Sequence, residues 1–294
     1  MGFKRTKGLL VRDWKEGVVN LVTYPRAKCC PNVSPWSLKV ETFLRLFNIP
    51  YQVVNNQFKN ASTKGQVPFI ELNGRHHADS ANIVEFLTKE FNLPIDNFSP
   101  KQKADARAYT FLLEDSFIPA IFYFRSLDPK WMFTEDKGLL GNFTGAKKVL
   151  FKTMGPRQIK SAIKKRLHVQ GMGRNSPDEV EEIMKRDLKA LSNLLADKDY
   201  FFGSSPGSFD ATAFACLAML LECPQPNDSI VKFVDSNVSN LRAFFNRVKA
   251  QAWPDWDHVC QNLELNRKTD AEIAAEVNQQ VAAENFEKSE LQAS

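Results

Sequence analysis

An α/β domain followed by an all-helical domain is the fold class that the sequence predicts. Three observations support it: buried-strand patterns near the N-terminus, a proline-led strand that ends in an Asn-Gly turn, and helical apolar spacing throughout the second half. We place the α/β domain at residues 17–92, a linker at 93–102 and the helical domain at 103–264. A polar lead-in at residues 1–16, which we expect to be flexible, and a polar tail at residues 265–294 flank them.

The first elements follow from β-branched residues and from capping signals. Residues 18–23 are rich in valine and threonine, which predicts a buried strand. A long turn with two prolines follows at residues 24–34. Ser34 and Pro35 form a helix start, with serine as the cap and proline at the first position, and this helix must end before Pro50. Residues 51–54 supply a second strand.

A proline hairpin is the most informative motif of the chain. Residues 65–72 form a strand that opens on Val67-Pro68, and Asn73-Gly74 is the two-residue turn expected of a tight hairpin. Only X-Pro bonds adopt the cis form at an appreciable frequency, and we expect Val67-Pro68 to be cis, with the neighbouring backbone groups facing outward. A helix then begins at Ser80 and extends to Phe91.

The second half of the chain contains helix signals only. Residues 101–127 predict a long helix that Pro119 should kink. Ser176-Pro177-Asp178-Glu179 is a strong helix start, and that helix should reach about Ala196. Residues 209–221 are so apolar that they predict the buried central helix of this domain. Residues 229–250 and 252–264 supply the remaining helices.

Composition narrows the class of protein. With 294 residues, 43% hydrophobic and 25% charged, the chain is typical of a globular protein, and it lacks the 18-residue apolar run of a spanning helix. The odd count of five cysteines and the absence of a secretory signal favour the reducing cytoplasm. The pattern Met1-Gly2-Phe3-Lys4-Arg5-Thr6 fits N-myristoylation loosely, and the sequence does not decide whether Gly2 is modified.

A basic segment stands out against the rest of the chain. Residues 138–177 contain nine lysines and arginines and no acidic residue, and all nine fall at residues 147–174. Such a segment fits an anionic membrane surface, which would make the protein peripherally associated, or an acidic protein partner; a solvated helix face is the alternative. Nucleic acid is not predicted, because Phe151 is the one aromatic residue interleaved with the basic ones.

The chain resembles the Fax (failed axon connections) family, which includes cadmium-responsive nematode proteins and is related to the metaxins and to glutathione S-transferases. Four blocks in matching order carry the resemblance: Tyr24 to Ala27, Ser34 to Thr42, Lys64 to Gly74 with Ala78-Asp79-Ser80, and Gln170 to Arg174 leading to Phe209 to Phe214. It implies a thioredoxin-like N-terminal domain and an all-α glutathione-transferase-like C-terminal domain. Two departures stand out. Ser37 replaces a frequent cysteine, and Gly207 replaces a capping Ser or Thr, although we expect that helix to start normally.

The resemblance implies a site for glutathione as co-substrate. A transferase needs a hydrogen-bond donor to stabilise the thiolate, and the candidates are Ser34 and Tyr24; for Ser34, the alternative role is a helix cap only. The residues implied in glutathione binding are Val67, Pro68, Asp79, Ser80, Gln66 and Lys39, with Lys64 as an alternative for the glycyl carboxylate. Cys29-Cys30, with His76-His77 nearby, match no established ligand spacing, so no metal is predicted.

Two functions follow from these residues. The first is a glutathione transferase that conjugates or binds glutathione in stress response or detoxification. The second is a non-catalytic adaptor, membrane-associated or active in axon development, as the resemblance to relatives of that kind implies. Homodimer formation is a further expectation of the transferase-like fold.

Overall fold

The computed structural model describes residues 4–5 and 8–266 and confirms the predicted fold class. A four-stranded mixed sheet has the order β3-β2-β5-β6. Its strands are β2 (Val19–Thr23), β3 (Tyr51–Asn55), β5 (Phe69–Leu72) and β6 (Arg75–Ala78). The β2–β3 pair is parallel, and β5 is antiparallel to both β2 and β6. The predicted hairpin is confirmed, with Asn73 and Gly74 both at positive φ, as a two-residue turn requires.

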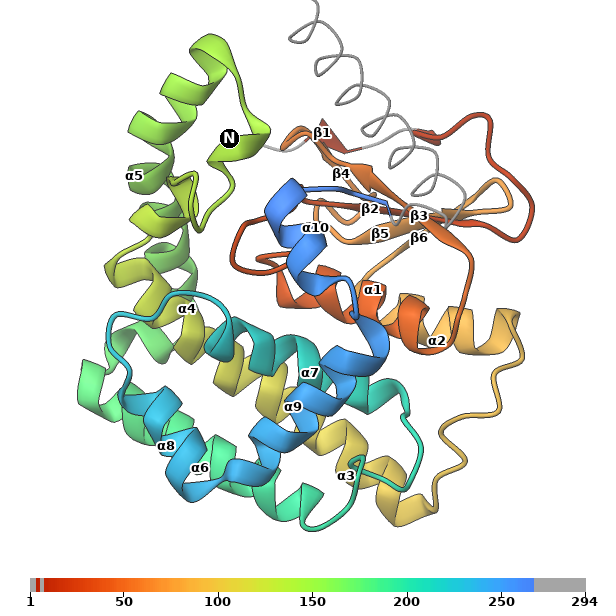
Figure 1. Ribbon diagram of the computed structural model, residues 1–294, viewed down its shortest axis with the longest axis vertical. Helices are drawn as coiled ribbons and strands as arrows, with labels where there is room; N and C mark the ends of the chain where they lie inside the picture. The colour runs from red at the N-terminus through yellow and green to blue at the C-terminus, as the bar shows by residue number, and fades with distance from the viewer. Residues whose placement is uncertain (1–3, 6–7, 267–294) are drawn as a thin grey trace, which may run out of the picture.

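Two helices cover one face of this sheet, α1 (Pro35–Leu46) and α2 (Ser80–Glu90). Helix α1 begins after the predicted cap Ser34, and α2 begins at Ser80 as predicted, with Asp79 as its cap. Helix α1 lies between the sheet and the helical half of the molecule (Figure 1). Almost every side chain of α1 is buried for that reason, including the charged Lys39 and Glu41.

The lead-in and residues 55–65 contain two short strands that the sequence does not predict. Strand β1 (Lys4–Arg5) pairs in parallel with β4 (Asn60–Ala61). Further along, the backbone N–H groups of Leu10 and Val11 donate to the buried carboxylate of Glu71 in β5. Part of the lead-in is therefore hydrogen-bonded to the sheet.

The helical half begins after residues 93–99, which contain neither helix nor strand. The division of the chain into domains at 93–102 stays a prediction. The long helix expected over 101–127 consists of α3 (Pro100–Phe111), a π-helical turn η1 (Leu112–Phe117) and α4 (Ile118–Leu127). Pro119 has no N–H to offer, so the carbonyl four residues earlier, that of Asp115, needs another donor. The Gln170 side chain supplies it at 2.9 Å.

Helix α5 (Gly145–Gln170) is the longest helix of the described chain and contains Pro156. Two short 3₁₀ turns, η2 (Lys130–Phe133) and η3 (Leu140–Asn142), precede it, and η4 (Met172–Arg174) follows. In Figure 1, α5 stands along one edge of the molecule and reaches from the helical half to the level of the sheet.

The remaining helices form the core of the helical half. They are α6 (Pro177–Leu195), α7 (Ser208–Leu221), α8 (Ser229–Asn237), α9 (Ser239–Ala252) and α10 (Trp256–Asn262). Helix α7 is buried along nearly its whole length, as predicted, and starts normally after Gly207. The helix expected over 229–250 is interrupted at Val238, which separates α8 from α9. In the part of the chain that the structure describes, no helix has both the length and the apolar character to cross a bilayer.

Candidate functional site

The Val67-Pro68 peptide bond is cis, which confirms the prediction. Pro68 is buried and leads directly into β5, whereas Val67 is half-buried. Phe69 is the first residue of β5 that pairs with the neighbouring strands, so Val67 lies two residues before the ladder begins. Within residues 4–5 and 8–266, neither the N–H nor the C=O of Val67 has a hydrogen-bond partner. These two groups therefore offer a short free edge to an extended peptide.

Asp79 and Ser80 lie next to this edge. Phe69 pairs with Ala78 in the last pair of the β5–β6 ladder, so Pro68 on one strand and Asp79 on the other come directly after that pair. The Lys64 ammonium is 3.6 Å from an Asp79 carboxylate oxygen, which brings the Lys64–Gln66 turn to the same place. Ser80 is buried, while Gln66 and Asp79 are exposed. The structure thus gathers five of the predicted glutathione-binding residues around one backbone edge.

The backbone of Asp79 is strained. Its φ of 85° lies in the left-handed half of conformational space, where residues other than glycine are rare. Its carboxylate nevertheless caps α2 by accepting from the N–H of Ala81 at 3.1 Å. Strained backbone of this kind is concentrated at binding and catalytic sites.

Ser34 serves as the helix cap that the sequence offers as its alternative role. Its hydroxyl oxygen accepts from the Ser37 N–H at 3.4 Å, and its own N–H donates to the Asn32 side chain at 3.0 Å. The residue is only 7% exposed. The hydroxyl proton is still available for donation, so capping and thiolate stabilisation are compatible at this residue.

Tyr24 lies at the end of β2 against an aromatic cluster. Its ring stacks on Phe58 at 5.4 Å, and Phe58 in turn contacts Phe143 and Phe151. Burial raises the pKa of Tyr24 to about 12, against a smaller opposing effect of Arg166. The hydroxyl is consequently a weaker acid, and a weaker hydrogen-bond donor to a thiolate, than that of an exposed tyrosine.

Lys39 is engaged elsewhere. Its ammonium is 2.8 Å from a carboxylate oxygen of Glu114 in the π-helical turn, and its side chain is 5% exposed. In this arrangement the charge of Lys39 joins α1 to the helical half and is not available to a glycyl carboxylate. Lys64, at the exposed edge near Asp79, is the better placed of the two lysines.

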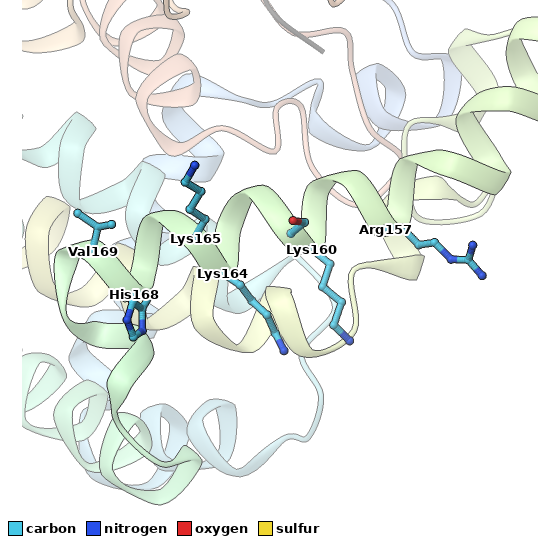
Figure 2. A pocket seen from close by; sticks show the side chains of 7 residues that line it. Arg157, Lys160, Lys164, Lys165, His168 and Val169 are labelled. Carbon is cyan, nitrogen blue, oxygen red and sulfur yellow. The ribbon is translucent and has the colours of Figure 1, made fainter.

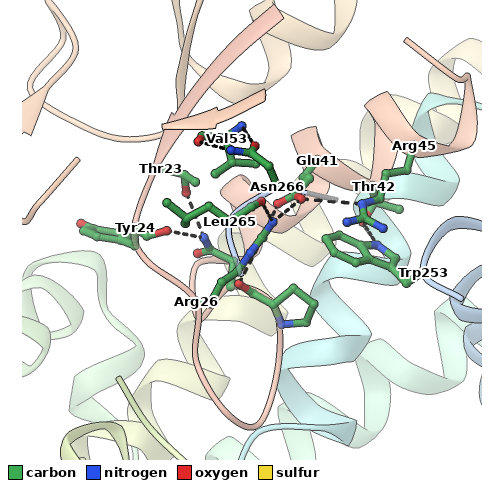
Figure 3. A network of polar contacts seen from close by, with 12 residues as sticks. Thr23, Tyr24, Arg26, Glu41, Thr42, Arg45, Val53, Trp253, Leu265 and Asn266 are labelled. Carbon is green, nitrogen blue, oxygen red and sulfur yellow. Dashed lines mark hydrogen bonds and ion pairs between the residues drawn. The ribbon is translucent and has the colours of Figure 1, made fainter. Parts of the chain in front are cut away.

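A buried ion-pair network anchors the loop that carries Tyr24, Cys29 and Cys30 (Figure 3). The Arg26 guanidinium makes a bidentate pair with Glu41, at 2.6 and 2.7 Å. It also donates to the backbone carbonyls of Glu264 and Leu265. The Asn32 side chain closes the loop by donating to the Thr23 hydroxyl and the Tyr24 carbonyl.

The loop places Cys29 and Cys30 beside Cys223, which lies just beyond α7. Hydrogen bonds from Cys29 and Cys30 hold the pKa of Cys223 well below its usual range, and the same contacts with Cys223 raise the pKa of Cys29 and Cys30. His76 and His77 are not part of this group. His76 packs at a tilt against Phe69, His77 stacks on Phe86, and burial lowers the pKa of both histidines. The sequence gives no signal for Cys223, because its partners lie 193 or more positions away.

The basic segment forms the exposed face of α5. In Figure 2, Arg157 and Lys164 point to one side of this face, and Lys165 and Val169 point to the other. Apolar side chains are exposed on the same helix: Val149, Leu150, Met154 and Val169 are between 48% and 75% exposed. This mixed surface was recognised in the sequence by its charge and not by its apolar residues.

Comparison with known protein families defines the class. The chain matches the glutathione S-transferase N-terminal domain over residues 35–131 and the glutathione S-transferase C-terminal domain over residues 184–248. A glutathione transferase from Phanerochaete chrysosporium has a similar structure, with a TM-score of 0.56, 13% identity and coverage of 81% of this chain and 98% of that one. Another, from Ceriporiopsis subvermispora in complex with glutathione, gives a TM-score of 0.52, 14% identity and coverage of 86% of this chain and 100% of that one. The protein therefore has a glutathione-transferase-like fold.

Known proteins are also similar to the chain in sequence. Failed axon connections of Drosophila melanogaster is 34% identical over 263 residues, which cover 86% of this chain and 62% of that protein. Metaxin-2 of Mus musculus is 28% identical over 231 residues, which cover 75% and 82%. The chain is thus similar in sequence to failed axon connections and to metaxin-2, and it matches glutathione S-transferase domains in both halves. It spans less than two thirds of the length of the Drosophila protein.

Proposed function

We propose that this protein binds a glutathione-type thiol peptide along the Val67 backbone and that it acts mainly as a binding module, with weak conjugating activity. The observation that carries the proposal is the free Val67 edge beside the strained, exposed Asp79. The N–H and C=O of Val67 would pair with the cysteinyl residue of the peptide, as in the addition of a strand.

The charges at the edge fit the γ-glutamyl end of glutathione, which carries an ammonium and a carboxylate group. The carboxylate of Asp79 would accept from the ammonium, and the Ser80 hydroxyl, at the first turn of α2, would donate to the carboxylate. The exposed Lys64–Asp79 pair, at 3.6 Å, is a weak interaction and would open at little cost.

We expect weak conjugating activity because neither the Ser34 nor the Tyr24 hydroxyl is well suited to stabilise a thiolate. Ser34 is buried and caps α1, and burial raises the pKa of Tyr24 to about 12. A thiolate needs a well-placed donor to form near neutral pH, and neither hydroxyl is both exposed and acidic. We expect any turnover with a generic electrophile to depend on Ser34 and to be lost in Ser34→Ala, whereas Tyr24→Phe retains it.

Calorimetric titration with glutathione tests the binding proposal. The Asp79→Asn variant keeps a good helix cap and a residue that tolerates positive φ, but it removes the charge. A charge-assisted hydrogen bond contributes about 1.5–3 kcal/mol, so affinity should fall about 10- to 100-fold. The matched control is Glu85→Gln on the same helix, whose carboxylate is exposed and paired with Lys89. Equal affinity in the wild type and in Asp79→Asn, or no heat with millimolar glutathione, would overturn the proposal.

A second candidate function rests on the exposed face of α5. Its lysines and arginines beside exposed Val149, Leu150 and Met154 suit the surface of an anionic bilayer, where basic groups meet lipid phosphates and apolar groups enter the interface. Each basic residue near such a surface contributes about 1 kcal/mol of attraction. The protein would then associate peripherally with a membrane.

Sedimentation with phosphatidylserine-containing vesicles tests this second function. We expect salt-sensitive binding that falls at least tenfold in Lys164→Glu/Lys165→Glu. Lys101→Glu/Lys232→Glu, on other exposed helix faces, makes the same change in net charge and serves as the control. An equal loss in both variants would show that net charge acts without a specific surface. Binding to an acidic protein but not to vesicles would reject the membrane in favour of a protein partner.

A further inference from the structure

Three cysteine sulfur atoms converge at a place that the proposed peptide site does not use. Cys29 and Cys30 come from the loop after β2, and Cys223 comes from the chain just beyond α7. The Sγ–Sγ distances are 3.5 Å for Cys30–Cys223 and 3.9 Å for each of the pairs that include Cys29. We call these residues the three-cysteine cluster.

The spacing of the sulfur atoms suits a metal ion. Zn–S bonds are about 2.3 Å long, so two thiolates on a tetrahedral zinc ion lie about 3.8 Å apart. All three distances in the cluster fall close to that value before any adjustment. The 3.5 Å separation is also far longer than a disulfide bond, and adjacent cysteines such as Cys29-Cys30 form a poor bridge.

A buried cation without a carboxylate partner lies close enough to Cys29 and Cys223 to act on both thiols electrostatically. Arg125 in α4 is 6% exposed, and its guanidinium donates to the Val33 carbonyl at 2.9 Å and contacts the Met219 thioether at 3.5 Å. Aromatic rings of Phe122 and Trp131 also surround it. Among the described residues, no carboxylate pairs with Arg125. A buried guanidinium of this kind needs a compensating negative charge.

A divalent ion held by three thiolates supplies that charge. Three thiolates and one M²⁺ ion sum to a net charge of −1, which the positive charge of Arg125 neutralises. A monovalent ion would leave a net −1 in the interior after this compensation, which is costly. Soft thiolate ligands also select against magnesium and calcium, which take oxygen ligands.

We propose that Cys29, Cys30 and Cys223 form a thiolate site for a soft divalent cation of the zinc class. Cys30 and Cys223 are buried, and the half-buried Cys29 gives the ion an entry path. The bound ion would join the loop of residues 24–34 to the end of α7, two elements that are far apart in the chain. It would thereby fix the loop that leads into Ser34, and the protons that the thiols still carry would be released to solvent on binding.

Titration of the reduced, chelator-treated protein with Co²⁺ tests this site. Cobalt takes the same ligands as zinc and reports thiolate coordination by its absorption. We expect one Co²⁺ per chain, displaced by Zn²⁺, in the wild type and in Cys216→Ser, a buried cysteine of α7 outside the cluster. Binding should be lost in Cys223→Ser. Unchanged binding in Cys223→Ser, or no thiolate absorption in the wild type, would overturn the proposal.

A measurement on the wild type alone avoids any folding defect of the variants. We expect Zn²⁺ to slow the alkylation of Cys29, Cys30 and Cys223 at least tenfold under conditions in which the protein is partly unfolded. The alkylation rate of the buried Cys260, which lies outside the cluster, should not change. Alkylation rates that zinc does not change, or a Cys30–Cys223 disulfide that forms equally fast with zinc present, would show that the cluster does not hold a metal.

Discussion

At the scale of one residue, Asp210 is a buried carboxylate that caps the central helix of the helical half. It lies in the first turn of α7, and its carboxylate accepts from the N–H groups of Phe201 at 2.9 Å and Gly207 at 2.8 Å. Burial raises the pKa of Asp210 to about 6, although these two hydrogen bonds oppose the shift. The same carboxylate thus completes the helix cap that Gly207, having no side chain, cannot provide.

This raised pKa predicts a pH dependence of stability. Between pH 4 and 6, the folded state keeps a proton on Asp210 that the unfolded state releases, so the free energy of unfolding falls as pH rises through this window. The slope from this one group is at most about 1.4 kcal/mol per pH unit. Asp210→Asn does not titrate, so denaturant unfolding of both proteins across pH isolates the effect. The stability of the wild type relative to the variant should be largest near pH 4 and smallest above about pH 6. A stability difference that increases with pH would contradict a raised pKa of Asp210 in the folded protein.

At the same scale, the roles of single residues show what could be read from the sequence. The cis Val67-Pro68 bond, the Asn73-Gly74 turn and the cap at Ser34 depend on neighbours in the chain, and local signals predicted all of them. The partners of Lys39 and Cys30 are Glu114 and Cys223, which are 75 and 193 positions away. Only the packing of the two halves brings such pairs together, so no local pattern announces them.

At the scale of an element, only part of helix α5 could be predicted from the sequence. Its basic charge was evident in the sequence, but its continuity through Gly155-Pro156 was not, because that pair is typical of a helix end. The reason lies in packing. A Cβ on Gly155 would lie 2.1 Å from the ring of Phe133, so the helix approaches η2 more closely than any other residue would allow.

Gly155→Ala tests this packing by the sign of its effect. In an exposed helix, alanine stabilises relative to glycine by about 1 kcal/mol. Here the clash with Phe133 should destabilise the protein by about 1–3 kcal/mol, measured by denaturant unfolding. Gly203→Ala is the control, because no atom lies within 4 Å of the added Cβ. A more stable Gly155→Ala protein would mean that Phe133 does not pack against the helix.

At the scale of the whole molecule, the Arg26–Glu41 pair links three distant segments. Arg26 belongs to the loop after β2, Glu41 to α1, and the carbonyls that complete the guanidinium's hydrogen bonds to residues 264 and 265. Arg45, which also contacts Glu41, lies 3.7 Å from the ring of Trp253. The end of the helical half is therefore held against the α/β half by buried charges.

Removal of one charge from this network should be costly. Glu41→Gln leaves Arg26 buried without its full counter-charge, and loss of one partner of a buried pair typically destabilises by about 3–5 kcal/mol. Urea unfolding should show this loss, while the exposed Glu85→Gln stays within about 0.5 kcal/mol of the wild type. A loss below about 1 kcal/mol in Glu41→Gln would mean that the pair adds little to the contact between the two halves.

The central claim is that a thiol peptide lies along the free edge at Val67. Amide NMR of the full chain during titration with glutathione tests it most directly, because it reports on the backbone groups themselves. The account predicts that the largest, saturable shifts occur at the amides of Val67 and Ser80, with the amides of α5 unchanged. Saturable shifts that leave Val67 unaffected, or an absence of shifts at millimolar glutathione, would contradict it.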